Sequence, residues 1–558
     1  MDLAAELQER SVQITALHAQ LPKLYLDLQI QYKAQAQQMV EYKKEVIEYK
    51  TKANYWEAQF SQLKSREEQL LSEMEELKAA LKKREQQLFG RRSEKSTKKL
   101  DEASVNTQPS KPKKNRGQQV GAKGHGRRDH DHLPIVDEIV SITDASCPCC
   151  QLPYKELAHT EDSEMLDIIN VRAYRRKVQR KKYRRCCQCR ENSDPQIICA
   201  PVTEKLIPKS KIGVSIWAHV LLQKYEYQQP LNRTLEQLSK YGLSLPIGTI
   251  TDGLKTLLPL FIPVFDAMVN RSIEASHWHA DETGWKVFES IEGKKSNRWY
   301  LWIFHNEETV VYKISPSRSS AVLVDHFGED HAGGTLNVDR YSAYKAIAKE
   351  GLFILAFCWA HVRRDFLNHA KGYPHREAWG LAWAEKISHL YHLNKQRLEH
   401  ADKPTLFREH QIQLKNAIEI MHSQAKAESK DKELLPSQIK LVKSLLNHWE
   451  GLTIFVERPD IPMDNNTAER GLRSSVVGRK NYYGSSSVWS ADLAAAMFTI
   501  FKTVKLHGIN PHTWLLAYLQ ECATYGGAPP KEVARYLPWN MAPEVKARFS
   551  EPPRHETS

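Results

Sequence analysis

The sequence has no long apolar run and few cysteines for its 558 residues. Residues 257–269 form the best candidate for a membrane span, but Asp266 and two prolines interrupt them, and a span needs ~20 apolar residues. The start, MDLAAELQER, does not have the pattern of a secretory signal. Most of the nine cysteines fall in two tight clusters, unlike the framework of a disulfide-bonded secreted protein. We therefore expect a soluble, reduced, cytoplasmic protein.

Positive charge is concentrated in two segments. Lys and Arg total 80 against 67 for Asp and Glu, which gives a net charge of +13. Residues 91–128 carry 12 Lys or Arg against three acidic residues, and residues 171–190 carry ten and no acidic residue. The net positive charges of these two segments add up to more than that of the whole chain, so the rest of the chain is net acidic. This distribution predicts two local binding surfaces for a polyanion such as DNA.

Residues 1–90 carry an apolar heptad repeat, which predicts a long helix in a coiled coil. One register contains Leu63, Leu70 and Leu77, and the complementary register contains Phe60 and Met74. We expect Pro22 to begin the long helix, and the coiled coil to join two or more copies of the chain. The alternative is an amphipathic helix that packs on its own protein.

The two cysteine clusters each contain a C-x-x-C pair, the arrangement that can present four thiolates to one Zn²⁺. The predicted structural zinc ligands are Cys147, Cys150, Cys186 and Cys189, with a small sheet between the pairs. Cys149 and Cys187 are surplus thiols, so other ligand choices stay open. The alternative is a set of reduced, buried thiols. Because cations crowd the second pair, we expect this module to contact DNA phosphates.

Strand-like and helical segments alternate in the rest of the chain. Residues 205–272 have helical spacing, and a turn at 241–244 gives a weak signal for a helix-turn-helix. Short strands are predicted at 276–280, 299–305, 310–315, 335–338 and 353–357. Helical periodicity returns at 367–450 and again after 464. The pattern predicts a β-rich core that a helical block interrupts.

Three acidic residues occupy positions at which a sheet could bring them together. Asp281 follows the strand predicted at 276–280, Asp339 follows the strand at 335–338, and Glu469 lies where a helix begins. Three oxygen donors at one point suit Mg²⁺ or Mn²⁺, and two such ions could catalyse phosphodiester chemistry. Strand alternation should point the neighbouring Glu282 away.

Each of these residues also has a structural interpretation. Asp281 and Asp339 could be turn residues or caps, and Glu469 could cap its helix with Asn466 or pair with Arg473. Cationic residues near the three acidic positions are predicted to contact DNA, together with cationic residues of the two basic segments. The alternative is that they are ordinary surface charges. The predicted DNA contacts are Arg127, Arg128, Arg175, Arg176, Lys181, Lys182, Arg184, Arg185, His361, Arg363, Arg364, Arg470, Arg473, Arg479 and Lys480.

Several blocks, in order, resemble the transposases of insertion sequence family 66 (TnpC type). Residues 88–95 (LFGRRSEK) and the cysteine pairs resemble that family's N-terminal regions. Its core is matched by 280–283 (ADET), 339–344 (DRYSAY), 358–364 (CWAHVRR) and 464–470 (DNNTAER). Residues 537–540 (LPWN) are similar to its C-terminal signature. The resemblance covers nearly the whole chain.

The resemblance implies a DD(E) enzyme with a ribonuclease-H-like core, whose metal-binding triad is Asp281, Asp339 and Glu469. The expected fold is multidomain: a coiled coil, a small zinc module and an α/β catalytic core interrupted by an all-helical insertion. Its predicted order is 1–90 coiled coil, 91–135 basic linker, 136–200 zinc module, 205–272 helical region, 273–366 first core part, 367–450 insertion, 451–508 second core part and 509–558 C-terminal segment.

The expected function is DNA transposition in the bacterial cytoplasm, at the nucleoid. Two Mg²⁺ or Mn²⁺ ions per active site would support cleavage at the element's ends and strand transfer of the released 3′-OH into target DNA. One structural Zn²⁺, double-stranded DNA, a second copy of the chain and small accessory proteins of the same element are the expected partners. The alternatives are a non-catalytic dimeric zinc protein that binds DNA, and a plain nuclease without strand transfer.

Overall fold

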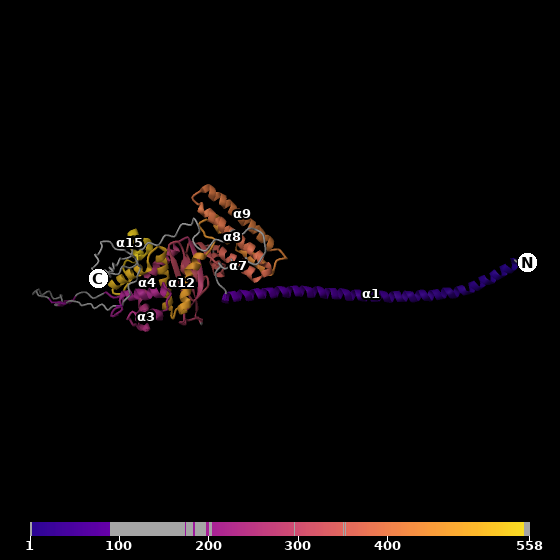
Figure 1. The fold of residues 1–558 in the computed structure, drawn as a ribbon, viewed down its shortest axis with the longest axis horizontal. Coiled ribbons are helices and arrows are strands. Elements are labelled where there is room, and N and C mark those ends of the chain that lie inside the picture. The colour runs from indigo at the N-terminus through magenta and orange to yellow at the C-terminus, as the bar shows by residue number, and fades with distance from the viewer. Residues whose placement is uncertain are drawn as a thin grey trace, which may run out of the picture. The chain divides into compact units, whose positions relative to one another are not determined.

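The computed structural model describes residues 3–89, 173, 182–184, 197–199 and 204–551, apart from 295, 350 and 352 (Figure 1). The chain forms two compact units, one of residues 1–90, 178–236 and 245–558, the other of 91–177 and 237–244. The basic linker and all four predicted zinc ligands, Cys147, Cys150, Cys186 and Cys189, lie outside the described residues.

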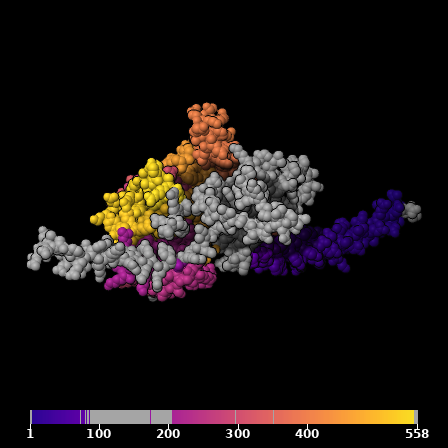
Figure 2. Space-filling view, turned by 60° about the vertical axis from the view of Figure 1, so that its left-hand side comes forward, coloured from indigo at the N-terminus to yellow at the C-terminus, as the bar shows by residue number. Residues whose placement is uncertain are grey.

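The N-terminal region is one continuous helix, α1 (Leu3–Phe89), which forms a narrow rod of side chains in the space-filling view (Figures 1 and 2). The predicted helix is therefore present. The expectation that Pro22 begins it was wrong, because Pro22 lies inside α1. Proline removes one intrahelical hydrogen bond, and here the helix continues through that loss.

A two-stranded antiparallel sheet of β1 (Lys182–Arg184) and β2 (Ile197–Cys199) flanks the second cysteine pair in the sequence. Lys182 pairs with Cys199 and Arg184 pairs with Ile197. β1 precedes Cys186 and β2 follows Cys189 in the sequence.

A five-stranded sheet forms the centre of the larger unit. Its strands are β3 (His277–Lys286), β4 (Arg298–His305), β5 (Val310–Ser315), β6 (Gly334–Val338) and β7 (Phe353–Phe357). Their spatial order is β5-β4-β3-β6-β7. β4 pairs antiparallel with both β3 and β5, and β6 and β7 run parallel to β3. All five predicted strands are present, although β3 continues well beyond its predicted end.

The helices that flank this sheet contain the segments predicted to be helical. Before the sheet come α2 (Val214–Tyr225), α3 (Leu231–Lys240) and α4 (Ile247–Ile273). Within and after the sheet lie α5 (Ala321–Phe327), α6 (Ser342–Lys349), α7 (Trp359–Gly372), α8 (Glu377–Glu399), α9 (Pro404–Glu428), α10 (Pro436–Asn447) and α11 (Trp449–Glu457). The C-terminal helices are α12 (Asn466–Tyr482), α13 (Val488–Leu506), α14 (Pro511–Thr524) and α15 (Pro543–Ser550). Single 3₁₀ turns occur at Pro374–Arg376, Val533–Tyr536 and Pro538–Asn540.

Among the described helices, α4 is long and apolar enough to cross a membrane by length and composition. One face of α4 is buried, including Leu257, Phe261 and Val264. Tyr518 of α14 also donates its hydroxyl to Leu260 O of α4. These contacts are those of a core helix, and they account for the apolar run at 257–269.

Helix α13 covers the outer strand of the sheet and is itself almost wholly buried. The Thr503 hydroxyl accepts a hydrogen bond of 3.0 Å from the backbone N–H of Val310, and that of Thr499 accepts one of 2.9 Å from Tyr312 N. Both backbone groups belong to β5, and both threonines are fully buried. A buried N–H without an acceptor is costly, so these hydroxyls complete the strand's hydrogen bonding.

We predict that Thr503→Val destabilises the protein by about 1–3 kcal/mol, because valine keeps the shape of threonine but leaves Val310 N–H without its acceptor. Chemical denaturation followed by circular dichroism measures this change. Thr524→Val, at an exposed position of α14, is the matched control and should stay within about 0.5 kcal/mol of wild type. Equal stability of the two variants would contradict the proposed role of Thr503.

Candidate active site

Strand register places Asp281 and Asp339 side by side. β3 and β6 pair in parallel, with His277 opposite Thr335 and His279 opposite Asn337. Each pair differs by 58 positions, and Asp339 follows Asp281 by the same 58. Continued for two more residues, the same register brings Asp281 level with Asp339, which directly follows β6, and neighbouring strands of a sheet lie about 4.8 Å apart.

The predicted position of Asp281 relative to its strand was wrong. It lies within β3 and pairs with Ile303 of β4, whereas the sequence predicted a position just after the strand. The strand continues because its second half leaves the short strand β6 and extends along β4 as far as Lys286. Asp339 does follow the last residue of β6, as predicted, and its Oδ1 accepts a hydrogen bond of 2.9 Å from Tyr341 N.

Two buried asparagines fasten the segment before α12 to these strands. Asn337 of β6 donates its side-chain amide to Pro462 O at 2.8 Å and Asp464 O at 3.2 Å. Asn465 donates its amide to Ala280 O of β3 at 2.7 Å, directly before Asp281. The segment is thus tied to both aspartate-bearing strands, and α12 begins from this anchor with Glu469 in its first turn.

Two histidines of β3 complete the anchor. His277 Nε2 lies 2.8 Å from Asn337 Oδ1, and His279 Nδ1 lies 3.0 Å from Asn465 Oδ1. Burial lowers the pKa of both imidazoles, that of His279 to about 3. The rings are therefore neutral at physiological pH, and each can donate one N–H to its asparagine oxygen.

The carboxyl groups interact strongly enough to keep a proton on Asp281. Burial, followed by the charges of Glu282, Asp339 and Glu469, raises the pKa of Asp281 to about 8 against one opposing backbone hydrogen bond. That hydrogen bond comes from Glu282 N at 2.9 Å. The three predicted triad residues are therefore within electrostatic reach of one another, although they come from β3, β6 and α12.

Glu469 faces helix α7. Its Oε1 lies 3.4 Å from His361 Nε2, and its Oε2 lies 3.8 Å from Arg364 Nη2. Oε1 is buried, and it has no hydrogen-bond partner among the described residues. Burial lowers the pKa of His361, and the charge of Glu469 opposes that change. The N-cap residue of α12 is Asn465, and Glu469 turns toward α7.

Cys358, His361 and Glu469 form a cluster whose potential metal-ligand atoms lie within 4.8 Å of one another. Burial raises the pKa of the Cys358 thiol to about 11, so the thiol is protonated at physiological pH. Its sulfur already accepts the Asn465 backbone N–H at 3.2 Å. Protonation makes Cys358 a poor metal ligand, and the oxygen of Glu469 is the donor in this cluster that suits a hard cation.

The predicted DNA-contacting cations have different surroundings. Arg470, Arg473 and Lys480 are exposed on α12. Arg479 donates to Thr283 Oγ1 and Gly284 O, so it fastens α12 to β3. Arg363 donates to Ser388 Oγ of α8 at 3.1 Å. Lys182 and Arg184 belong to β1, and the remaining predicted contacts lie outside the described residues: Arg127, Arg128, Arg175, Arg176, Lys181 and Arg185.

Glu282 has a buried position of its own. Its side chain is 1% exposed, and it accepts hydrogen bonds from Arg318 and from the Tyr344 hydroxyl. Burial raises the pKa of Glu282, and the hydrogen bonds from Tyr344 and Arg318 oppose that change. The contacts of Arg318 and Tyr344 with Glu282 were not recognised in the sequence, because Arg318 stands in no motif and both residues act across long sequence separations.

Comparison with known proteins identifies the family. The sequence profile described as "Transposase IS66 family" matches residues 209–493, which include all three carboxylates and more than half of the chain. The chain belongs to the IS66 transposase family. The matched region excludes α1 and both cysteine pairs. Membership indicates a nucleic-acid-processing role with divalent metal dependence and DNA as a partner.

Three relatives from Sinorhizobium fredii (strain NBRC 101917 / NGR234) are similar over most of this family member. Uncharacterized protein y4jD is 26% identical over 446 residues, covering 76% of this chain and 83% of the relative. Uncharacterized protein y4hP is 25% identical, covering 72% and 74% of the two chains. Uncharacterized protein y4qI is 25% identical, covering 74% and 77%.

We predict that Asp281→Asn stabilises this transposase in its metal-free form, and that the gain in stability grows as pH rises. The pKa of Asp281 is raised to about 8 in the folded protein, whereas it is near 4 in the unfolded chain. The wild-type protein therefore loses stability as pH rises from about 4 to about 8. Asparagine avoids the loss, and the difference should grow by up to about 1.4 kcal/mol per pH unit. Denaturation in EDTA from pH 5 to 8 measures it.

The control for this experiment is Asp402→Asn, at an exposed turn. Its difference from wild type should stay constant over the same pH range. If the Asp281→Asn curve also ran parallel to that of the wild type, the carboxyl groups would not repel one another in the folded protein.

Proposed function

We propose that this chain cuts and joins DNA at the ends of a mobile element, with Asp281, Asp339 and Glu469 as its catalytic carboxylates. The observation that carries the proposal is the shared register of the two aspartates, together with the asparagine anchor that brings Glu469 to them. The charges of Asp339 and Glu469 act on Asp281 although the three residues come from separate elements, and carboxylates within such reach could serve metal-dependent phosphodiester chemistry.

The sheet supports a ribonuclease-H-like core. Three antiparallel strands are followed by two parallel ones in the order β5-β4-β3-β6-β7, and the first acidic residue lies on the central strand β3. Helices α8 to α11 lie in sequence between β7 and α12, which carries Glu469. This placement fits an insertion that separates Glu469 from the aspartates in sequence while the fold keeps them together.

The donor set fits Mg²⁺ or Mn²⁺. All three residues offer carboxylate oxygens, the ligands that hard divalent cations prefer. Glu469 Oε1 is buried without a hydrogen-bond partner among the described residues, and the charges around Asp281 repel one another. Bound divalent cations would neutralise this repulsion, polarise the scissile phosphate and favour ionisation of the attacking oxygen. We propose that two ions occupy the site.

The proposed reaction has two steps at one site, a hydrolysis followed by a transesterification. In the first, a water oxygen attacks the phosphorus at the element's end, the P–O3′ bond breaks, and a 3′-OH is released. In the second, that hydroxyl attacks a target phosphodiester, which loses its own 3′ oxygen. Asp281, Asp339 and Glu469 hold the reacting groups in line, and Arg364 and Arg470 lie where they can contact backbone phosphates.

We predict that Asp339→Asn abolishes cleavage of a duplex carrying the DNA ends that flank the chain's own coding element, assayed with Mn²⁺. Removal of one charged ligand should lower the rate by at least about 100-fold, while DNA affinity stays within about threefold. Mn²⁺ should also raise the unfolding temperature of wild type more than that of the variant.

Asp325→Asn, at an exposed residue of α5 that pairs with Lys313, is the control and should cleave like wild type. Equal cleavage by wild type and Asp339→Asn, or tight DNA binding without cleavage by either, would refute the enzymatic proposal. Cleavage without joined products when target DNA is supplied would instead identify a plain nuclease.

We propose that recognition of the element's ends uses the basic linker and a zinc module. Cys147, Cys150, Cys186 and Cys189 would hold the zinc, and the ten cations of residues 171–190 would contact DNA phosphates. The pairing of β1 with β2, which flank the second cysteine pair in the sequence, is consistent with a small metal-stabilised module.

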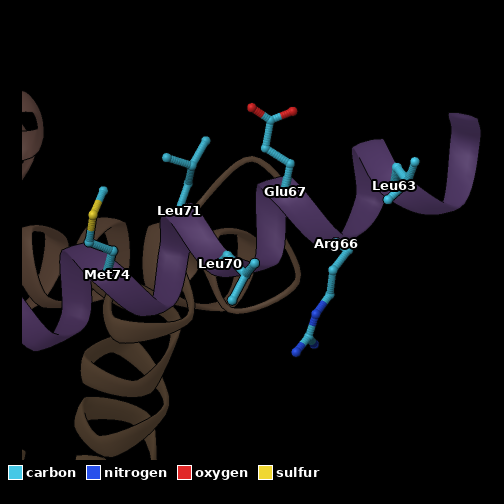
Figure 3. A pocket seen from close by; sticks show the side chains of 6 residues that line it. All are labelled: Leu63, Arg66, Glu67, Leu70, Leu71 and Met74. Atoms are coloured by element: carbon cyan, nitrogen blue, oxygen red, sulfur yellow. The ribbon is translucent and has the colours of Figure 1, made fainter.

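We propose that α1 pairs with α1 of a second copy as a coiled coil. Its heptad side chains are largely exposed, Leu63 by 66% and Leu77 by 71%. Figure 3 shows the side chains around a shallow hollow of about 350 Å³ whose lining belongs to α1 alone, Leu63, Leu70, Leu71 and Met74 among them. A helix of 87 residues that exposes such a stripe gains stability by burying it against another helix.

We predict that Leu63→Lys/Leu70→Lys weakens self-association of the full chain by at least about tenfold, because two apolar layers of the coiled coil acquire charges. Sedimentation across a concentration series measures the dissociation constant. Ser61→Lys/Ser65→Lys adds the same charges at outward heptad positions and should leave association unchanged. Identical association of both double variants would reject α1 as the self-association element.

A further inference from the structure

Arg318 is held in a fixed orientation beside the candidate active site. Its Nε and Nη2 both donate to Glu282 Oε1, at 2.9 and 2.6 Å. Its guanidinium lies 3.9 Å from the centre of the Tyr341 ring, and the Tyr341 hydroxyl donates to Arg318 O at 3.2 Å. Glu282 and Tyr341 thus hold the guanidinium of Arg318 in place, and Tyr341 also binds its backbone carbonyl.

Both partners belong to the segments that carry the aspartates. Glu282 is the residue after Asp281, and Tyr341 donates its backbone N–H to Asp339 Oδ1 at 2.9 Å. Burial lowers the pKa of Arg318, but Glu282, Tyr341 and Asp339 outweigh that effect and raise it. The guanidinium therefore lies within electrostatic reach of the acidic centre and stays charged.

The ion pair between Arg318 and Glu282 is asymmetric in its burial. The Glu282 side chain is 1% exposed and that of Arg318 is 38% exposed. Tyr344 donates to the other carboxylate oxygen, so Glu282 is fully engaged beneath the surface. Arginine has five N–H donors, and the contacts with Glu282 use only its Nε and Nη2. The outer edge of the guanidinium is left facing solvent.

A buried ion pair adds little net stability to a fold, because the desolvation of the carboxylate offsets its attraction to its partner. What this arrangement does supply is orientation: a planar guanidinium with one edge on Glu282 and one face on Tyr341, within electrostatic reach of Asp339. Planar N–H donors in that position match the oxygens of a phosphate.

We propose that Arg318 binds a DNA backbone phosphate next to the reacting one, and that Glu282 is a positioning residue that holds Arg318 for this contact. The inference rests on the proposed function, because it assigns the substrate contact of the same site. Arg318 also offsets part of the negative charge of Glu282 and Asp339, which would otherwise repel the DNA.

The test measures binding and cleavage separately in the full chain. A fluorescein-labelled 40-base-pair duplex is titrated in Ca²⁺ over a series of salt concentrations, and cleavage of the element-end duplex is followed in Mn²⁺. Loss of one phosphate contact in Arg318→Gln should reduce the slope of log Kd against log salt by about 0.9. Arg298→Gln, an exposed arginine over the Tyr300 ring, is the matched control and should keep the slope.

Two further variants separate charge from orientation. Arg318→Lys and Glu282→Gln both retain a cation at position 318, so both should keep the salt slope, yet cleavage should fall about tenfold because the cation is no longer held in place. If Arg318→Gln is unstable beside an unpaired Glu282, the double variant Glu282→Gln/Arg318→Gln removes both charges and supplies the same measurement.

An unchanged slope in Arg318→Gln, or in the double variant, would overturn the phosphate contact. Wild-type cleavage by Glu282→Gln would overturn the positioning role. Failure of the wild type itself to cleave would refute the proposed catalytic function, and the salt slope would still decide whether Arg318 contacts DNA.

Discussion

Two asparagine side chains hold the candidate active site together. Asn337 and Asn465 contribute amides that cross-link the chain between β3, β6 and the segment before α12, over separations of more than 100 residues. Both side chains are almost wholly buried, so their hydrogen bonds form where an unmet partner costs most. These links join the start of α12, and hence Glu469, to both aspartate-bearing strands, and Arg479 fastens the later part of the helix to β3.

Around this anchor the protein places charges that disfavour one another. A proton remains on Asp281 in the absence of cations, because burial and three nearby carboxyl groups oppose its ionisation. Neutral His277 and His279 support the asparagines without adding charge. The asparagines and histidines thus hold neighbouring segments in place without charge, while the carboxyl groups repel one another. Such repulsion is expected of a site that binds cations and phosphates.

The sequence predicted the sheet and the three carboxylates because their signals are local. Each strand is a short apolar run between turn residues, and Asp339 and Glu469 stand in recognisable blocks. The length of β3 could not be predicted, because its second half is specified by pairing with β4 rather than by its own alternation. Arg318 stands outside the recognised blocks, and the contacts of Tyr344 and of the asparagine anchor were equally hidden, since their partners are distant in sequence.

Helices lie against both outer strands of the sheet. On β5, the hydroxyls of α13 engage two outward N–H groups, and on β7 the backbone of α11 comes so close that a side chain at Gly451 would meet Leu355 O at 2.4 Å. A sheet whose outer strands are both covered cannot accept an added strand from another protein. Partners that assemble on this core must therefore bind through its helices and loops.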